Sequence, residues 1–254
     1  MKVLLIGATG NVGLRLVAAL LTHGHNVVAY VRSAQKLQSL LPASVYRQLS
    51  VVEGNAYDSH AIKNAIIHND CEAVVNSAGV AAMAPWGKSD LPQIFAAVLE
   101  GVKQAGAERK KPLRVWFLGG LGVLSFPGSN SILSDHVPIF LAHRKNMALL
   151  KTLPPNTVDW SMICPSTMTP ESSDFSVPTK SSHARLTASA GTPPLWQDSW
   201  MKHIPLIGKS LVAAMNASRY DTTLEQNADF IAHDLETRDS QYIGARVGII
   251  DASR

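Results

Sequence analysis

A three-glycine loop near the N-terminus constrains the fold more than any other feature of the sequence. The glycines are three residues apart, directly after the apolar run Lys2–Ile6 and just before an amphipathic segment. Glycine suits this position because the chain turns tightly, the backbone approaches a pyrophosphate and the helix packs closely on the strand. Free N–H groups and the helix dipole then face the phosphates. We therefore predict a dinucleotide-binding loop at Gly7, Thr9, Gly10, Asn11, Val12 and Gly13.

Short apolar runs alternate with helical patterns as far as residue 165. The predicted strands are Lys2–Ile6, Asn26–Val31, Leu49–Val52, Glu72–Asn76, Leu113–Leu118 and Asp159–Ile163. The predicted helices are Val12–His23, Ala34–Leu41, Ser59–His68, Leu91–Arg109 and Val137–Leu150. Asp58 is placed to cap the third of these helices. Such alternation predicts an α/β fold with a doubly wound, Rossmann-like parallel sheet.

The amino-acid composition changes after Pro165. Residues 165–195 are rich in serine, threonine and proline and predict a long loop or set of loops, typical of a lid or binding segment. Helical patterns return near Leu195–Met215 and Leu224–Leu235, and Arg246–Ile250 predicts a final strand that returns to the core sheet. We therefore expect an NAD(P)-binding core over residues 1–165 and a small C-terminal substrate-binding region over 166–254.

The end of the second predicted strand indicates which dinucleotide binds. NAD sites usually offer an acidic residue there, whereas this strand ends in Arg32 and Ser33. Arginine can pair with a 2′-phosphate and serine can add a hydrogen bond, so we expect NADP(H) in preference to NAD(H). The turns after the third and fourth strands complete the expected cleft, with Asn55 and Ala56 near the adenine and Ser77, Ala78 and Gly79 beside the ribose.

Composition excludes several other classes of function. The net charge is +4, but the basic residues are scattered, and the longest run, Arg109–Lys111, is typical of a helix end. We therefore expect no nucleic-acid partner. Cys71 and Cys164 adjoin apolar segments without a metal-ligand pattern, so neither a disulfide nor a metal site is predicted. No apolar run is long enough to span a bilayer or serve as a signal peptide, which favours a cytoplasmic protein, either monomer or homodimer, with no membrane partner.

The motifs together resemble the short-chain dehydrogenase/reductase superfamily, in its atypical, NAD(P)-binding NmrA-like branch. The resembling segments are Gly7–Gly13, Val31–Ser33, Gly54–Asp58, Asn76–Gly79 and Asp159–Pro165. More narrowly, Phe117–Leu124 with Trp160–Pro165 is similar to fungal oxidoreductases of the averufin-oxidase type, which act in aromatic polyketide pathways. The resemblance implies that Pro165 flanks the nicotinamide and that the C-terminal region holds the substrate.

The chain departs from the superfamily at the catalytic residues. Typical members use Tyr-x-x-x-Lys and a preceding serine, but no such pair occurs here: Leu141 stands four residues before Lys145. After the fifth strand the first serine is Ser125, which is displaced. His143 is the best candidate to replace the tyrosine, because histidine titrates near neutrality and this one lies in the same helix. Lys145 and His136 are second choices.

These observations favour an NADPH-dependent oxidoreductase of secondary metabolism that acts on a small-molecule aromatic, quinone-like or polyketide-derived substrate. The reduction of electron-poor acceptors depends less on a proton donor from the protein. Flat substrates stack on aromatic side chains. The candidate lining residues are Trp86, Phe126, Met168, Trp196, Trp200 and Met201. A non-catalytic NADP-binding redox sensor and a non-redox isomerase or cyclase with His143 as base are the alternatives.

Overall fold

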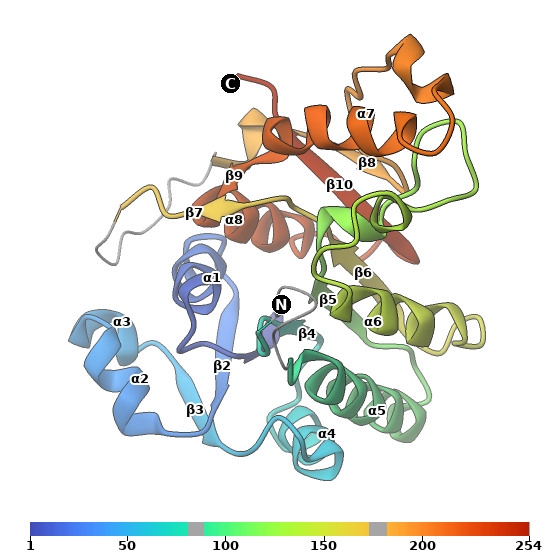
Figure 1. The fold of residues 1–254 in the computed structure, drawn as a ribbon. Coiled ribbons are helices and arrows are strands. Elements are labelled where there is room, and N and C mark those ends of the chain that lie inside the picture. Colours follow the sequence, from blue (N-terminus) through green and yellow to red (C-terminus); the bar gives the residue numbers. More distant parts are fainter. Residues whose placement is uncertain (81–88, 173–181, 254) are drawn as a thin grey trace.

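Eight strands form one sheet at the centre of the computed structural model, which describes residues 1–80, 89–172 and 182–253 (Figure 1). In spatial order they are β3 (Ser50–Glu53), β2 (Asn26–Val31), β1 (Lys2–Ile6), β4 (Ala73–Asn76), β5 (Arg114–Leu118), β6 (Asp159–Ile163), β10 (Ala245–Asp251) and β8 (Leu186–Ala190). Seven run parallel, and β8 pairs antiparallel with β10 at the edge. The strand order reverses between β1 and β4, which is where open α/β sheets bind ligands. The predicted doubly wound α/β fold is confirmed.

Helices cover both faces of the sheet because alternate residues of the central strands point to opposite sides. Leu4 and Ile6 of β1 pack toward α4 (Ser59–His68), α5 (Leu91–Arg109) and α6 (Ala142–Lys151). Val3 and Leu5 pack toward α1 (Asn11–Thr22), α2 (Ala34–Leu40) and α8 (Leu224–Asp234). Both faces of the sheet are therefore shielded from solvent, as the continuous apolar strands predict. No helix within the described ranges is long and apolar enough to cross a membrane.

Shorter elements complete the fold, most of them in the C-terminal region. Two two-residue strands, β7 (Met168–Thr169) and β9 (Thr222–Thr223), pair in a separate small sheet. Helix α7 (Gly208–Ala217) lies above the end of the main sheet in Figure 1. The remaining short helices are α3 (Ala43–Tyr46), η1 (Leu121–Val123), η2 (Leu133–Asp135), η3 (Ser182–Arg185), η4 (Trp200–His203) and η5 (Ser218–Tyr220).

Three sequence predictions need correction. The helix expected near Leu195–Met215 is present only as the short η4 and, from Gly208, as α7, because Pro205 interrupts the helical pattern. The helix expected from Val137 begins at Ala142, since Pro138 lacks an N–H and Phe140 adopts a left-handed backbone with φ of 50°. The segment expected as loops over 165–195 contains β8, whose short, half-exposed edge position leaves little hydrophobic signal. The other predicted helices and strands of the first 165 residues are present with ends shifted by at most one residue, and the Asp58 carboxylate caps α4 by accepting from the Ala61 N–H.

The three-glycine loop makes a sharp prediction about stability. A Cβ at residue 13 would lie 2.0 Å from the carbonyl oxygen of Gly7, and that glycine is itself fixed by a φ of +92°. Gly13→Ala should therefore lower the free energy of unfolding by at least about 2 kcal/mol, as forced overpacking does. A Cβ at Gly10 would meet only the Gly7 carbonyl oxygen, at 3.4 Å.

Chemical denaturation of the two variants measures the difference. Gly10→Ala is the matched control and should unfold close to the wild type. Equal losses in both variants would show that helix packing against the loop is not the reason for glycine at position 13.

Candidate functional site

The first turn of α1 presents the features that a phosphate site requires. Gly10 is the N-cap, no side chain caps the helix, and the first turn contains no acidic residue. The first N–H groups of a helix have no partner within the helix, so those of α1 are available to an anion. Gly10 and Asn11 are exposed, whereas Gly13 is buried against Gly7. The chain's own residues therefore fit a pyrophosphate at this helix terminus.

The loop after β4 contacts the phosphate loop. A Cβ on Gly7 would come within 2.6 Å of the Ala78 backbone nitrogen, so the two loops are in contact. The Ser77 hydroxyl donates to the Ile6 carbonyl at 3.0 Å, which holds the β4 loop to the end of β1. Gly79 has a φ of +102° and packs against Leu91 at the start of α5. Ser77, Ala78 and Gly79 thus lie together beside the glycine loop, and their predicted place beside the ribose stays a prediction.

Arg32 and Ser33 follow β2 at the same edge of the sheet. Arg32 is exposed, and no carboxylate pairs with it among the described residues. The Ser33 hydroxyl caps α2 by accepting from the Lys36 N–H. Sequence reasoning missed a neighbour: β3 pairs with β2 so that Glu53 lies opposite Val31, and its carboxylate accepts from the Ala34 N–H at 2.6 Å. An acidic group therefore does lie near this corner, although it comes from the adjacent strand.

Asn55 and Ala56 follow β3 and complete this side of the cleft. The Asn55 side chain accepts from the Tyr57 N–H, and its backbone carbonyl accepts from the Tyr30 hydroxyl at 3.2 Å. Ala56 is partly buried against the core. The structure brings this turn to the same sheet edge as the glycine loop, because parallel strands all end there. Its predicted contact with the adenine stays a prediction.

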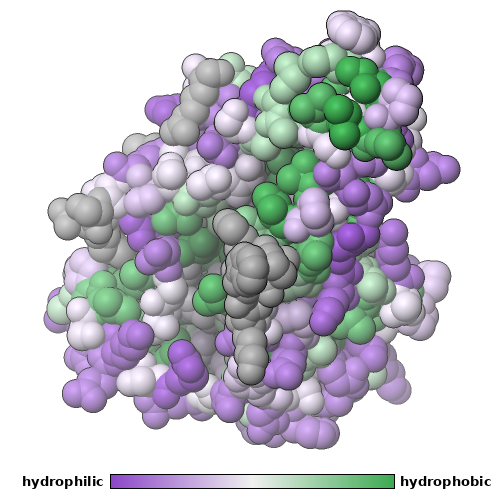
Figure 2. Space-filling view, in the orientation of Figure 1, coloured by the Kyte–Doolittle hydropathy of each residue, from purple (hydrophilic) through white to green (hydrophobic). Residues whose placement is uncertain are grey.

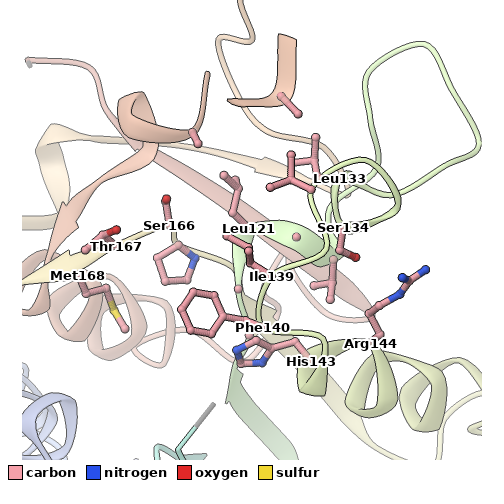
Figure 3. Close-up of a pocket in the computed structure, with 18 residues that line it drawn as sticks. Leu121, Leu133, Ser134, Ile139, Phe140, His143, Arg144, Ser166, Thr167 and Met168 are labelled. Atoms are coloured by element: carbon pink, nitrogen blue, oxygen red, sulfur yellow. The ribbon is translucent and has the colours of Figure 1, made fainter. Parts of the chain in front are cut away.

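A pocket of about 380 Å³ opens past the ends of β5 and β6 (Figure 3). It is lined by backbone of the glycine-rich turn after β5, by apolar side chains and by three hydroxyls. The lining residues are Gly119, Gly120, Leu121, Gly122, Val123, Leu133, Ser134, Val137, Ile139, Phe140, His143, Arg144, Pro165, Ser166, Thr167, Met168, Ala213 and Ala217. Strands β2 and β5 are three strand spacings apart, about 14 Å, which suits an extended dinucleotide that reaches from Arg32 to this pocket.

His143 is the pocket residue whose chemistry the structure changes most. Its ring packs against Gly120, where a Cβ would lie 3.0 Å from the ring carbon Cδ2, and Figure 3 shows it beside Phe140. Its Nδ1 is buried, with no hydrogen-bond partner among the described residues. Burial lowers the pKa of His143 from 6.5 to about 4. The expectation of titration near neutrality is therefore wrong, and the imidazole is uncharged at pH 7.

The other candidate catalytic residues lie elsewhere. Lys145 is exposed and does not line the pocket, because two positions along a helix correspond to a rotation of about 200° from His143. Ser125 also lies outside the lining, and its hydroxyl accepts from the Arg246 guanidinium at 3.2 Å. His136 is not among the lining residues, and its Nε2 lies 2.8 Å from the Ser131 hydroxyl. Of the candidates, the structure thus places only His143 in the pocket.

The predicted aromatic lining is largely wrong. Trp86 lies outside the described residues, and of the remaining five candidates Met168 alone lines the pocket. Phe126 is buried in the core against Trp196, and Trp200 is 77% exposed. The lining aromatic is instead Phe140, which no motif marks because its position depends on the irregular turn before α6. Composition cannot separate core from pocket for such residues.

A buried arginine connects the C-terminal region to the start of α1. The Arg15 Nε donates to the Glu225 carboxylate at 3.0 Å, and the Arg15 guanidinium also donates to the backbone carbonyls of Asn11 and Ser172. Glu225 in turn accepts from the Glu171 N–H. These contacts hold residues 171 and 172 beside the phosphate loop. No sequence pattern predicts this, because Arg15 reads as an ordinary helix-surface arginine.

The depressed pKa of His143 has a consequence for stability. Between about pH 6.5 and pH 4 the unfolded chain binds a proton at His143 that the folded chain does not. This contribution to stability is complete above pH 6.5 and is lost as the pH falls toward 4. Lowering the pH from 7.5 to 4.5 should therefore reduce the Tm of His143→Gln by a few degrees less than it reduces the Tm of the wild type.

Thermal unfolding at the two pH values tests this, and His68→Gln, an exposed histidine on α4, is the control. Parallel pH profiles for the wild type and His143→Gln would contradict the assignment of a neutral, buried imidazole.

Solved structures share this architecture at low sequence identity. A candidate epimerase from Bacteroides thetaiotaomicron has a TM-score of 0.63 and 19% identity, with 98% of this chain and 96% of that chain covered. A candidate NADH-flavin reductase from Streptococcus pneumoniae has a TM-score of 0.61 and 18% identity over 99% of both chains. A short-chain dehydrogenase/reductase from Veillonella parvula in complex with NADP has a TM-score of 0.61 and 12% identity, over 99% and 94%. No curated protein sequence matches the chain at a significant level.

One family model identifies the chain more directly. The model of the NAD(P)H-binding family matches residues 7–191, which begin at the first glycine of the phosphate loop and extend past Pro165 in the pocket. This range includes the glycine loop, Arg32, the β4 loop and most of the pocket lining. The chain therefore belongs to the NAD(P)H-binding family.

Proposed function

We propose that this protein is an NADPH-dependent reductase of flat, electron-poor aromatic acceptors of the quinone or polyketide-derived kind. The observation that carries the proposal is the chemistry of the pocket beside the cofactor cleft. Among its described lining residues, His143 and Arg144 alone carry titratable side chains, and His143 is uncharged at neutral pH. When bound, the nicotinamide supplies a hydride to an acceptor positioned against it.

An acceptor of this kind suits a pocket with a weak proton donor. A simple ketone needs a proton as its oxygen becomes negative, and typical members of the superfamily provide it with Tyr-x-x-x-Lys, which this chain lacks. A quinone or flavin spreads the negative charge over its ring system and takes its proton from water. A neutral imidazole can still donate or accept one hydrogen bond, so we assign His143 to orient a carbonyl oxygen.

The surface around the pocket supports an apolar substrate. Ile139 and Phe140 line the pocket and are also 44% and 38% exposed, so apolar surface continues from the lining to solvent. Further exposed apolar side chains lie on and before α7, and Figure 2 shows them gathered on one face. The exposed residues of this group are Leu206, Ile207, Leu211 and Met215. A charged, highly solvated substrate would gain little binding free energy from these apolar surroundings.

The preference for NADPH rests on Arg32, with Glu53 acting against it. An exposed arginine beside Ser33 can pair with a 2′-phosphate, whereas the Glu53 carboxylate on the Ala34 N–H repels one. We also infer an aromatic polyketide substrate from the resemblance of Phe117–Leu124 and Trp160–Pro165 to averufin-oxidase-type proteins, which rests on these residues alone.

Substrate panels test the reaction. NADPH oxidation should be measured with quinones and flavins on one side and simple aliphatic and aromatic ketones on the other. We expect turnover with the first group and at least about tenfold lower kcat/KM with the second. The reason is that His143 is uncharged at pH 7 and Arg144, the other titratable side chain of the described lining, is ion-paired with Asp135. His143→Gln should retain turnover of quinones within about tenfold, since a true general acid would cost about 10²–10⁴-fold.

The outcomes also separate the alternatives. Tight NADPH binding without turnover of any acceptor would contradict the proposal and favour a redox sensor. Consumption of a substrate without net NADPH oxidation would favour an isomerase or cyclase.

Cofactor preference is tested with Arg32→Ala and Glu53→Gln. Arg32→Ala should weaken NADPH binding by about tenfold while NADH binding changes less than about twofold, because only NADPH carries the 2′-phosphate. Glu53→Gln should tighten NADPH binding relative to NADH. Arg47→Ala, which also removes one exposed positive charge, is the control. Equal losses of NADPH and NADH affinity in Arg32→Ala would refute its role.

A further inference from the structure

Three histidines and two carboxylates meet at the end of α1 that lies opposite the phosphate loop. His23 follows the last residue of α1, His183 lies in η3, and Asp229 and His233 lie in α8, with Glu236 just beyond. Helix α1 has 12 residues, so this cluster is about 18 Å from the glycine loop. The proposed reaction uses none of these residues. We call the five residues the histidine cluster.

The members of the histidine cluster contact one another in an alternating order. Asp229 lies between two imidazoles, 2.7 Å from the His23 Nε2 and 2.6 Å from the His183 Nδ1. Glu236 lies 2.7 Å from the His23 Nδ1 and 3.1 Å from the His233 Nδ1. The rings of His183 and His233 are stacked, with centroids 4.1 Å apart and planes 13° apart. His23 therefore contacts a carboxylate through each of its ring nitrogens.

Burial removes the water that would otherwise hydrogen-bond to these groups. The side chains of His23 and Asp229 are completely buried, while that of His183 is 20% exposed. Each imidazole nitrogen that faces a buried carboxylate must carry a hydrogen or bind a cation, because a bare lone pair would repel the oxygens. An N–H on the facing nitrogen meets that requirement, and so does one divalent ion. The partial exposure of His183 offers such an ion a route to the buried carboxylate.

We propose that His23, His183 and Asp229 form a binding site for one divalent transition-metal ion of the zinc class. The ligating atoms would be the His23 Nε2, the His183 Nδ1 and a carboxylate oxygen of Asp229, which lie within 4.8 Å of one another. Two imidazoles and one carboxylate are a common set for zinc in proteins, with water in the fourth position. Ligand atoms around a tetrahedral ion with bonds of about 2.0 Å are about 3.3 Å apart. His23 faces the Oδ1 of Asp229 and His183 faces the Oδ2, so the ion would contact both oxygens, or one ring would move to share a single oxygen.

The remaining two members of the histidine cluster support the ligands. With the ion bound, Glu236 would accept from the His23 Nδ1–H, and the lone pair of Nε2 would bind the ion. A carboxylate on the second ring nitrogen is the usual arrangement behind a metal-binding histidine. The His233 ring stacks on His183 and restricts its rotation. The His183 backbone N–H also donates to Asp229 at 2.7 Å, so η3 and α8 are held together with or without the ion.

Titration of the chelator-treated full-length protein with Zn²⁺ tests this site. Isothermal titration calorimetry should show one Zn²⁺ bound to the wild type, and Co²⁺ in its place should give the visible absorption of a tetrahedral nitrogen–oxygen site. His183→Gln should weaken Zn²⁺ binding by at least about 100-fold, and Glu236→Gln by about 10–100-fold as a supporting carboxylate. His68→Gln should bind like the wild type.

Asp229→Asn provides a further check, because it keeps the shape of the side chain and removes its charge. Should its circular dichroism show that it does not fold, the partly exposed His183→Gln carries the test. Wild-type protein that binds no Zn²⁺, or binds it no more tightly than His183→Gln, would overturn the proposal and leave hydrogen bonds as the contacts within the cluster. NADPH affinity should be unchanged by His183→Gln, which separates this site from the cofactor cleft.

Discussion

The contact between Gly13 and the carbonyl oxygen of Gly7 sets the geometry on which the cofactor cleft depends. With no Cβ between them, the first turn of α1 packs directly on the turn that leaves β1. The uncapped N–H groups of α1 then face outward at the carboxyl edge of the sheet. Gly7 in turn contacts the loop after β4, so the strands on either side of the switch point are joined at the same place. A larger residue at either glycine would separate these elements.

Burial decides the chemistry of the pocket. The same apolar lining that would hold an aromatic substrate removes water from around His143 and holds its pKa at about 4. A histidine in water would be partly protonated at pH 7 and could serve as an acid. In this pocket the imidazole is uncharged at pH 7, so it can hydrogen-bond a ligand but has no imidazolium proton to donate. The properties that favour binding of a flat apolar acceptor therefore also disfavour reactions that need a strong proton donor.

Helix α1 links two separate regions of chemistry. Its N-terminus faces the predicted phosphate position, and its C-terminus reaches the histidine cluster. Helix α8, from the far end of the chain, packs along it and supplies both Glu225 for Arg15 and Asp229 for His23. Residues of the C-terminal region therefore fix the helix that carries the glycine loop. Strand β10 has a similar part in the main sheet, where it lies between β6 and β8.

The sequence by itself determined the fold class, the glycine loop and the family, because these depend on local spacing: three glycines after a strand, and apolar runs alternating with helices. It also marked Arg32 and His143, which adjoin those elements. Only the tertiary structure decided what surrounds them. Glu53 reaches the Arg32 corner through pairing of β2 with β3, Phe140 lines the pocket through an irregular turn, and the histidine cluster unites residues 23 to 236. Burial and contact between distant segments set charge and proton affinity, and neither can be read from neighbours along the chain.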